Sequence, residues 1–177
     1  FGLDEFQSGK IILNGEEIKK PRPDLMIEKK VALLTEVRKQ EGFVPLLSIR
    51  ENESLSVMKE MASRFGVIDR KRQEQFAEDI SKRMTVKMSG IEQQVVSLSG
   101  GNQQKVVIAK CLASGPKLFL LDEPTRGEDD YAKSEIYKIL RQAAEEGTAI
   151  LIFSSELEEL LANCSKIIIL KKGNVTG

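Results

Sequence analysis

The 177-residue sequence contains no histidine. This absence excludes acid–base catalysis by an imidazole and metal sites that use histidine ligands. The two cysteines, Cys111 and Cys164, lie far apart and form no CxxC motif. We therefore interpret them as reduced, mostly buried thiols of a cytosolic protein.

An excess of one sign of charge is also absent. Lysine plus arginine and aspartate plus glutamate number 27 each, so the formal net charge is zero. Broad nucleic-acid-binding surfaces normally show a basic excess, and the balance argues against a nucleic-acid partner.

Long apolar runs are missing as well. The longest, residues 118–121, 149–153 and 167–170, are far shorter than the roughly 20 residues that span a bilayer. No basic segment followed by an apolar stretch opens the chain, so nothing indicates secretion. Because the chain begins at Phe1 without a methionine, we expect it to be a fragment or a processed piece.

The pattern of the first 42 residues predicts an N-terminal segment that consists mainly of β-strands. Residues 10–13 predict a short strand that leads into an Asn14-Gly15 turn. Pro21 and Pro23 mark a loop. The apolar run at residues 31–35 predicts a second strand, which ends beside a polar residue.

Residues 43–97 have little strand signal and many charges, which predicts a helical subdomain. Ser48 and Glu51 fit a capping box, and we expect it to open a helix that extends to about Phe65. A second helix is predicted after Asp69, where apolar side chains recur at every fourth position.

From residue 98 to residue 177 helices and strands alternate. Strands that are continuously apolar, separated by helices, predict a parallel sheet covered by helices. The expected helices are residues 101–113, 131–146 and 155–161, and the expected strands are residues 117–121, 148–153 and 166–170.

Two acids, Asp122 and Glu123, follow four apolar residues of one of these strands. The carboxyl end of a buried parallel strand is where α/β folds bind ligands. In phosphoryl-transfer sites one acid organises Mg²⁺ and a neighbouring group positions the attacking water. We assign Asp122 to the metal and Glu123 to the water. A buried strand that meets a solvated loop explains the same residues.

Ser99, Gly100 and Gly101 directly precede a predicted helix. A serine hydroxyl, accessible glycine amides and a helix N-terminus together form a favourable anion site. A loop that merely caps the helix is the alternative.

These two segments resemble one protein family. The run LSGGNQ at residues 98–103 resembles the signature motif LSGGQ of ABC ATPases, with an inserted asparagine. Residues 118–124 resemble their Walker B motif, and the run DEPTRG at residues 122–127 strengthens the match. The combination is similar to the second ATPase half of bacterial ribose, galactose or xylose importers. The resemblance covers nearly the whole chain.

The resemblance implies an α/β fold with a parallel-sheet core of the P-loop NTPase type, an antiparallel β piece and a helical subdomain. The Walker A loop, GxxxxGK[ST], which holds the β- and γ-phosphates, is missing from the sequence. In the family it lies just before the position of Phe1. We therefore expect ATPase activity in the intact protein and none in this piece alone.

The resemblance also assigns ATP and Mg²⁺ as cofactors. It implies that the signature acts on ATP held by a second ATPase half across a head-to-tail dimer. The residues that it assigns to this contact are Ser99, Gly100, Gly101, Asn102 and Gln103.

Two positions depart from the family pattern. Glu36 stands where the family has a glutamine that senses Mg²⁺ and water, and Ser155 stands where it has a switch histidine. The resemblance makes both candidate catalytic residues beside Glu123, and both changes should weaken hydrolysis at this half's own site. Glu36 could equally be an exposed acid, and Ser155 with Glu158 fits a capping box.

Asp129 matches the family's D-loop, which crosses the dimer interface, whereas Glu128, Asp130 and Tyr131 depart from the small or apolar residues usual there.

The resemblance implies that the chain is the nucleotide-binding half of a sugar-importer ATPase. It would work peripherally at the cytoplasmic face of the inner membrane and power import through a separate transmembrane permease. A regulatory half that binds nucleotide and dimerises without hydrolysis is the alternative. A third class, soluble ABC proteins that work on DNA or ribosomes, is disfavoured by the neutral charge and by the absence of a long coiled-coil insertion.

Overall fold

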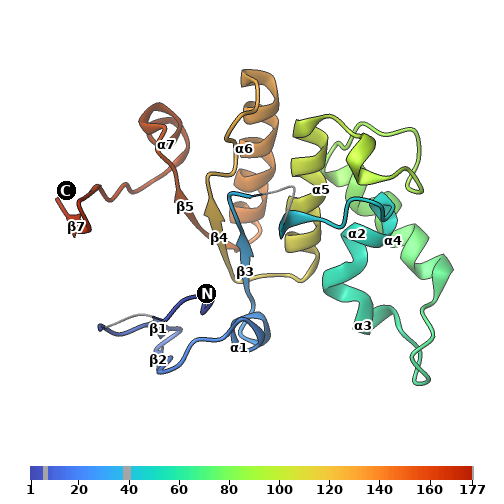
Figure 1. Ribbon diagram of the computed structural model, residues 1–177, viewed down its shortest axis with the longest axis horizontal. Coiled ribbons are helices and arrows are strands. Elements are labelled where there is room, and N and C mark those ends of the chain that lie inside the picture. Colours follow the sequence, from blue (N-terminus) through green and yellow to red (C-terminus); the bar gives the residue numbers. More distant parts are fainter. Residues whose placement is uncertain (6–7, 38–40, 177) are drawn as a thin grey trace.

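A three-stranded parallel sheet forms the centre of the molecule in the computed structural model, which describes residues 1–5, 8–37 and 41–176 (Figure 1). The strands lie in the order β3 (Val31–Leu34), β4 (Leu118–Asp122) and β5 (Ala149–Phe153). This arrangement confirms the α/β fold expected from the alternation of strands and helices.

The three strands pair in register. Leu34 lies opposite Leu121, and Leu121 lies opposite Ile152. Because the strands are parallel and end at matching positions, their carboxyl ends lie at one edge of the sheet.

Two helices cover one face of the sheet. Helices α5 (Gly100–Ala113) and α6 (Asp130–Glu145) pack their apolar sides against Phe119 and Leu121 of β4, which are both completely buried. Helix α1 (Pro23–Glu28) packs against Val31 and Leu118 on the opposite face. The sheet is therefore sandwiched at β3 and β4, where the apolar core is densest.

Strand β5 differs from the prediction of a buried strand. Only its α6-facing residues Ile150 and Ile152 pack against the core, whereas Leu151 and Phe153 on the other face are 45% and 48% exposed. The reason is its position: β5 is the last strand of the three, and no described element covers its second face.

The N-terminal turn is confirmed. Strands β1 (Ile12–Leu13) and β2 (Glu16–Glu17) form an antiparallel hairpin around Asn14 and Gly15, which both have positive φ. The strand is shorter than predicted. The assignment of Pro23 to a loop is wrong, because Pro23 opens α1, where its fixed φ and missing N–H suit the first helical position.

The region right of the sheet in Figure 1 is helical. Its first helix, α2 (Ile49–Ser54), begins at the predicted capping box, since Ser48 Oγ accepts from the Glu51 N–H and Glu51 accepts from the Ser48 N–H. The elements that follow are η2 (Leu55–Val57), α3 (Met58–Met61), α4 (Arg70–Arg83) and η3 (Val95–Ser97).

The prediction of one helix that reaches Phe65 is wrong. Ala62 turns to an extended conformation and pairs with Ile68 in an isolated antiparallel bridge, which closes a short turn and ends the helical run. The second predicted helix is confirmed as α4, whose N-cap Asp69 accepts a hydrogen bond from the Arg72 N–H.

The C-terminal part begins with α7 (Leu157–Asn163), close to the predicted short helix. The predicted strand at residues 166–170 is largely wrong, because only β6 (Leu170–Lys171) forms and pairs with β7 (Asn174–Val175) across a turn. Residues 166–168 pair with no neighbouring strand among the described residues, and Ile169 makes one backbone contact, accepting the Thr176 N–H at 2.9 Å.

One carboxyl group is buried inside the helical region. Glu53 of α2 is fully buried, and both of its carboxyl oxygens lie 2.9 Å from Ser81 Oγ of α4. Burial raises the pKa of Glu53 to about 8, although the hydrogen bond from Ser81 acts in the opposite direction. The neutral acid is therefore the form that the folded protein favours near neutral pH.

This burial predicts a pH-dependent stability. The folded-state pKa of Glu53 lies above the unfolded value, so its contribution is fully present below about pH 4.5 and is lost as pH rises through about 8. We expect the unfolding free energy to fall by about 2 kcal/mol or more between pH 6 and pH 9, measured by urea unfolding. Glu53→Gln, which carries no charge at either pH, should remove most of this fall.

Glu78→Gln is the matched control, because Glu78 lies exposed on α4. An equal fall with pH in the wild type and in Glu53→Gln would contradict the assignment to Glu53.

Candidate functional site

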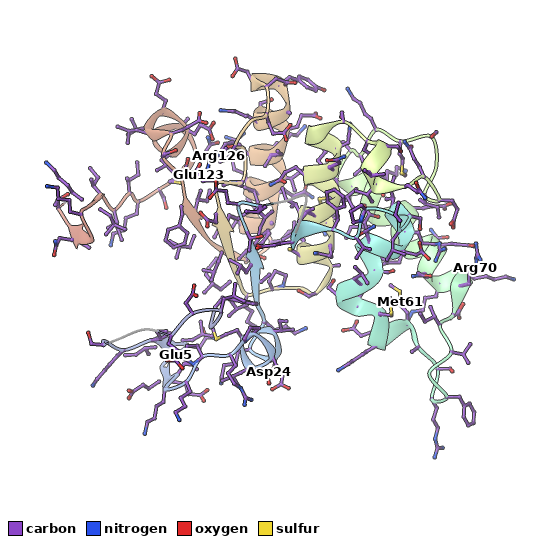
Figure 2. All side chains as sticks on the ribbon, viewed as in Figure 1. Glu5, Asp24, Met61, Arg70, Glu123 and Arg126 are labelled. Carbon is purple, nitrogen blue, oxygen red and sulfur yellow. The ribbon has the colours of Figure 1, made fainter. Side chains whose placement is uncertain are left out.

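The candidate site lies at the edge where the three parallel strands end. Glu36 follows β3, Asp122 ends β4, and Ser154 and Ser155 follow β5. Figure 2 shows Glu123 and Arg126 close together at this edge, far from Met61 and Arg70 in the helical region. The structure thus brings together the three predicted catalytic positions, 36, 123 and 155, through the register of the sheet.

Glu123 is held in an unusual backbone conformation. Its φ is 46°, which is uncommon for a residue with a side chain and costs on the order of 1 kcal/mol. Its N–H donates to the Phe153 carbonyl at 2.9 Å, and its Oε1 accepts the N–H of Ser155 at 2.8 Å. The last residue of β5 therefore fixes the backbone of Glu123, and the loop after β5 fixes its carboxylate.

Ser155 contributes its backbone to this contact. The prediction that Ser155 and Glu158 form a capping box is wrong, because the N-cap of α7 is Glu156 and no side chain caps it. The helix starts two residues later than expected, so the N–H of Ser155 is free to donate to Glu123.

Glu36 forms an ion pair with Arg126 across the edge. Both side chains are largely exposed, so the pair adds little to stability, but it places a guanidinium beside the carboxylate. The like-charge repulsion expected between Glu36 and a phosphate is therefore offset locally by Arg126.

Asp122 is partly exposed at the end of the central strand. Among the residues that the structure describes, no group of three or more acidic, cysteine or histidine side chains could hold a metal ion. A lone Asp122 carboxylate beside Glu123 nevertheless suits Mg²⁺, which usually takes one or two carboxylates and completes its shell with phosphates and water.

A cluster behind the edge anchors the loop after Asp122. The Glu159 Oε2 of α7 accepts the Thr125 hydroxyl at 2.5 Å and the Tyr137 hydroxyl at 2.6 Å, and Thr125 and Tyr137 are both buried. Lys133 of α6 forms an ion pair with the same carboxylate, at 2.6 Å from Glu159 Oε1.

Ionised Glu159 is the stable form in this cluster. Burial favours its neutral form, but the contacts with Lys133, Thr125 and Tyr137 outweigh burial and lower its pKa to about 2. The anion therefore ties α7 to the loop that carries Glu123. Sequence reasoning missed Glu159, because one more acid in a charged helix carries no local signal.

The predicted anion site lies at the start of α5. Ser99 is the exposed N-cap residue, and its side chain does not cap the helix. The first turn of a helix has N–H groups without intrahelical acceptors, and the Ser99 side chain does not accept from them. Ser99 therefore does not act as a simple helix cap, and the anion site at Gly100, Gly101 and Asn102 stays a prediction.

Helix α5 continues without interruption through Asn102. The asparagine therefore takes an ordinary helical position and does not disturb the helix as an inserted residue would. Gln103 is buried and donates to the carbonyls of Leu98 and Val96 at 3.0 and 3.2 Å. The structure therefore gives Gln103 an anchoring contact, and its predicted role in ligand binding stays a prediction.

Two contacts join α5 to the rest of the site. Gln104 donates to the Pro124 carbonyl at 2.6 Å, which ties α5 to the loop after Asp122. Gly101 approaches α6 so closely that an added Cβ would lie 2.9 Å from the Ala132 Cβ. Sequence reasoning did not find Gln104, which looks like any polar helical residue.

Asp129 lies at the N-cap of α6, where its Oδ1 accepts the Ala132 N–H at 2.8 Å. Gly127 before it has a positive φ of 75°, which suits the turn that leads into the helix.

None of the described helices is both long and apolar enough to cross a membrane.

Comparisons with known proteins identify relatives. The family model described as "ABC transporter" matches residues 1–126. The chain is 45% identical over all of its 177 residues to the ribose import ATP-binding protein RbsA of Bacillus cereus and 42% identical to that of Bacillus subtilis. It spans 36% of the length of these relatives.

Solved structures show the same fold. The dimeric post-hydrolysis structure of the ATP-binding cassette MJ0796, described as bound to ADP and Pi, matches 98% of this chain with a TM-score of 0.80 and 24% identity. The match covers 73% of that chain. The cbiO1 structure from Clostridium perfringens matches 99% with a TM-score of 0.79 and 22% identity, over 67% of its own length.

The contact between α5 and α6 predicts a specific rescue. Gly101→Ala should lower the unfolding free energy by about 1–3 kcal/mol, because the new methyl group meets the Ala132 side chain. In an Ala132→Gly background the same substitution should cost much less, since the nearest atom that it meets is gone and the other, Glu128 Oε2 at the end of a flexible side chain, is 3.3 Å away. Urea unfolding of the four proteins measures both costs.

Gly90→Ala is the control, because an added Cβ at Gly90 meets no atom within 4 Å. Equal losses from Gly101→Ala in both backgrounds would show that the packing against Ala132 is not the cause.

Proposed function

Since this chain belongs to the ABC transporter family, we propose that it is the nucleotide-binding half of a sugar-importer ATPase. The observation that carries the proposal is the edge of the sheet, where Asp122 ends the central strand and the Ser155 amide holds the Glu123 carboxylate. The names of the relatives support a sugar as the transported substrate.

Asp122 would hold Mg²⁺, which supplies positive charge to the phosphates when bound. Glu123 would orient the attacking water, because its carboxylate is fixed by the Ser155 amide and faces the edge. Under these roles the carboxylates of Asp122 and Glu123 and the Ser155 amide lie at the ends of strands, where a rigid backbone holds their geometry best.

The signature would act on a different nucleotide. Ser99 is exposed and its side chain does not cap α5, so its hydroxyl and the first-turn amides would offer donors for an anion. No phosphate-binding loop of the GxxxxGK[ST] kind occurs in these 177 residues. We propose that Ser99, Gly100 and Gly101 contact ATP bound to a second ATPase half in a head-to-tail dimer. The remaining length of the intact protein, by analogy with its relatives, would supply the missing loop.

A transmembrane permease would be the second partner, with the ATPase bound peripherally at the cytoplasmic face of the inner membrane. In this arrangement the helical region between residues 43 and 97 would move with nucleotide binding, and residues 1–42 and 98–177 would form the core.

A half that binds nucleotide without hydrolysis is the second candidate. The ion pair between Glu36 and Arg126 favours this candidate. The pair engages the Glu36 side chain, which stands at the position where the family senses Mg²⁺ and water. The serine at position 155 also lacks the charge of a histidine.

ATP turnover by the intact protein tests both candidates. Ser99→Arg should reduce kcat by a factor on the order of 10², because a bulky cation fills the anion site while Asp122 and Glu123 remain. Ser63→Arg, in an exposed turn of the helical region, is the control and should leave kcat near the wild-type value.

Glu123→Gln decides between the two candidates. Turnover below that of the wild type would assign hydrolysis to the site of this half that contains Glu123. Turnover equal to that of the wild type would favour a half that binds nucleotide without hydrolysis. Turnover near wild type in Ser99→Arg would contradict the role of the signature in trans.

A further inference from the structure

The side-chain amide of Asn102 lies between two partners. Its Oδ1 accepts the backbone N–H of Lys87 at 2.8 Å, and its Nδ2 donates to Ser99 Oγ at 2.8 Å. Asn102 therefore connects the loop after α4 to the serine of the signature.

The direction of this connection follows from elementary hydrogen bonding. A backbone N–H can only donate, so the oxygen of Asn102 must face Lys87. The opposite orientation of the amide would place its NH₂ group against the Lys87 N–H, donor against donor. The NH₂ group of Asn102 therefore faces Ser99, and the serine oxygen is the acceptor.

The Lys87 N–H is itself firmly held. The Lys105 ammonium of α5 donates to the Thr85 carbonyl at 3.1 Å, and the Val86 N–H donates to the Ser81 carbonyl at 2.9 Å. Lys105 is buried and also pairs with Glu135 of α6. The loop is thus anchored to α5 through Thr85 and to α4 through Val86, directly before Lys87.

The contact leaves the hydroxyl proton of Ser99 for an outside acceptor. Its oxygen receives the Asn102 N–H, its side chain does not cap α5, and the residue is exposed. A serine hydroxyl has one proton to donate, and among the described residues no hydrogen bond uses the Ser99 proton.

The same chain shows the opposite arrangement at another helix. Ser48 at the N-cap of α2 donates its hydroxyl to Glu51 Oε2 at 2.9 Å, because the residue three positions later is an acid. In the signature the residue three positions after Ser99 is an amide that donates. An acid at that position would take the serine proton, and an asparagine leaves it available.

We propose that Asn102 is a positioning residue, which orients the Ser99 hydroxyl as a hydrogen-bond donor toward a phosphate oxygen of ATP on the partner half. The proposal rests on the function proposed above and adds to it the residue that sets the direction of the Ser99 hydrogen bond. A donor that is oriented before the ligand arrives loses no stabilisation to reorientation when negative charge develops.

A double-mutant cycle in the intact protein tests the proposal. The four proteins are the wild type, Ser99→Ala, Asn102→Asp and the double variant, and kcat and KM for ATP are measured for each. Asn102→Asp keeps the shape of the side chain and its contact with the Lys87 N–H. Its second oxygen, however, accepts the Ser99 proton, as Glu51 accepts that of Ser48.

We expect Ser99→Ala and Asn102→Asp each to reduce kcat by about tenfold or more, and the double variant to match Ser99→Ala within about twofold. Asn102→Ala, which frees the hydroxyl to rotate, should give a smaller loss in the wild type and none in the Ser99→Ala background. Thermal unfolding shows whether Asn102→Asp disturbs folding. If it does, Asn102→Ala replaces it in the cycle.

Two outcomes would overturn the proposal in distinguishable ways. If Asn102→Asp reduces kcat by the same factor in both backgrounds, its effect comes from charge or structure and does not pass through Ser99. If Ser99→Ala itself leaves kcat unchanged, the role of the signature in the proposed function fails, and the orientation of Ser99 fails with it.

Discussion

The in-register pairing of β3, β4 and β5 is the constraint on which the site depends. Each strand carries a polar segment at its carboxyl end, and only matching registers bring Glu36, Glu123 and Ser155 to one edge. A shift of one residue in β4 would expose Phe119 and Leu121 and turn their neighbours inward. The burial of these two side chains beneath α5 and α6 therefore fixes the site as well as the core.

The start of α5 and the edge of the sheet are mechanically connected. The Gln104 contact with the Pro124 carbonyl and the close approach of Gly101 to Ala132 leave little room for α5 to move independently of the loop that carries Glu123. In the proposed dimer these two places would serve different nucleotides. A movement of the signature at one ATP would therefore displace Asp122 and Glu123 at the other site, through the contacts of Gln104 and Gly101.

Features that depend on neighbours in sequence could be predicted. The capping box at Ser48, the amphipathic α6 and the central strand β4 follow from local patterns, as does the motif that contains Asp122 and Glu123. Some failures depend on tertiary contacts, because the exposed face of β5 and the short β6 reflect which strands and helices are present to pack beside them. Others are local: Pro23 opens a helix, a short turn closed by Ala62 and Ile68 ends the helical run, and α7 begins later than predicted. The anchoring by Glu159 could not be found either, since its partners lie 22 and 34 residues away in sequence.

The two departures from the family pattern have unequal weight in this geometry. At position 155 the contact with Glu123 is made by a backbone N–H, which any residue except proline supplies, so a serine there keeps Glu123 in place. What the serine lacks is a charged side chain toward a phosphate. At position 36 the carboxylate is already paired with Arg126, so the pair as a whole brings no net charge to the edge. The edge thus retains the parts that hold Glu123. Under the proposed function it would keep the residue that positions water and lack charged side chains that respond to ATP.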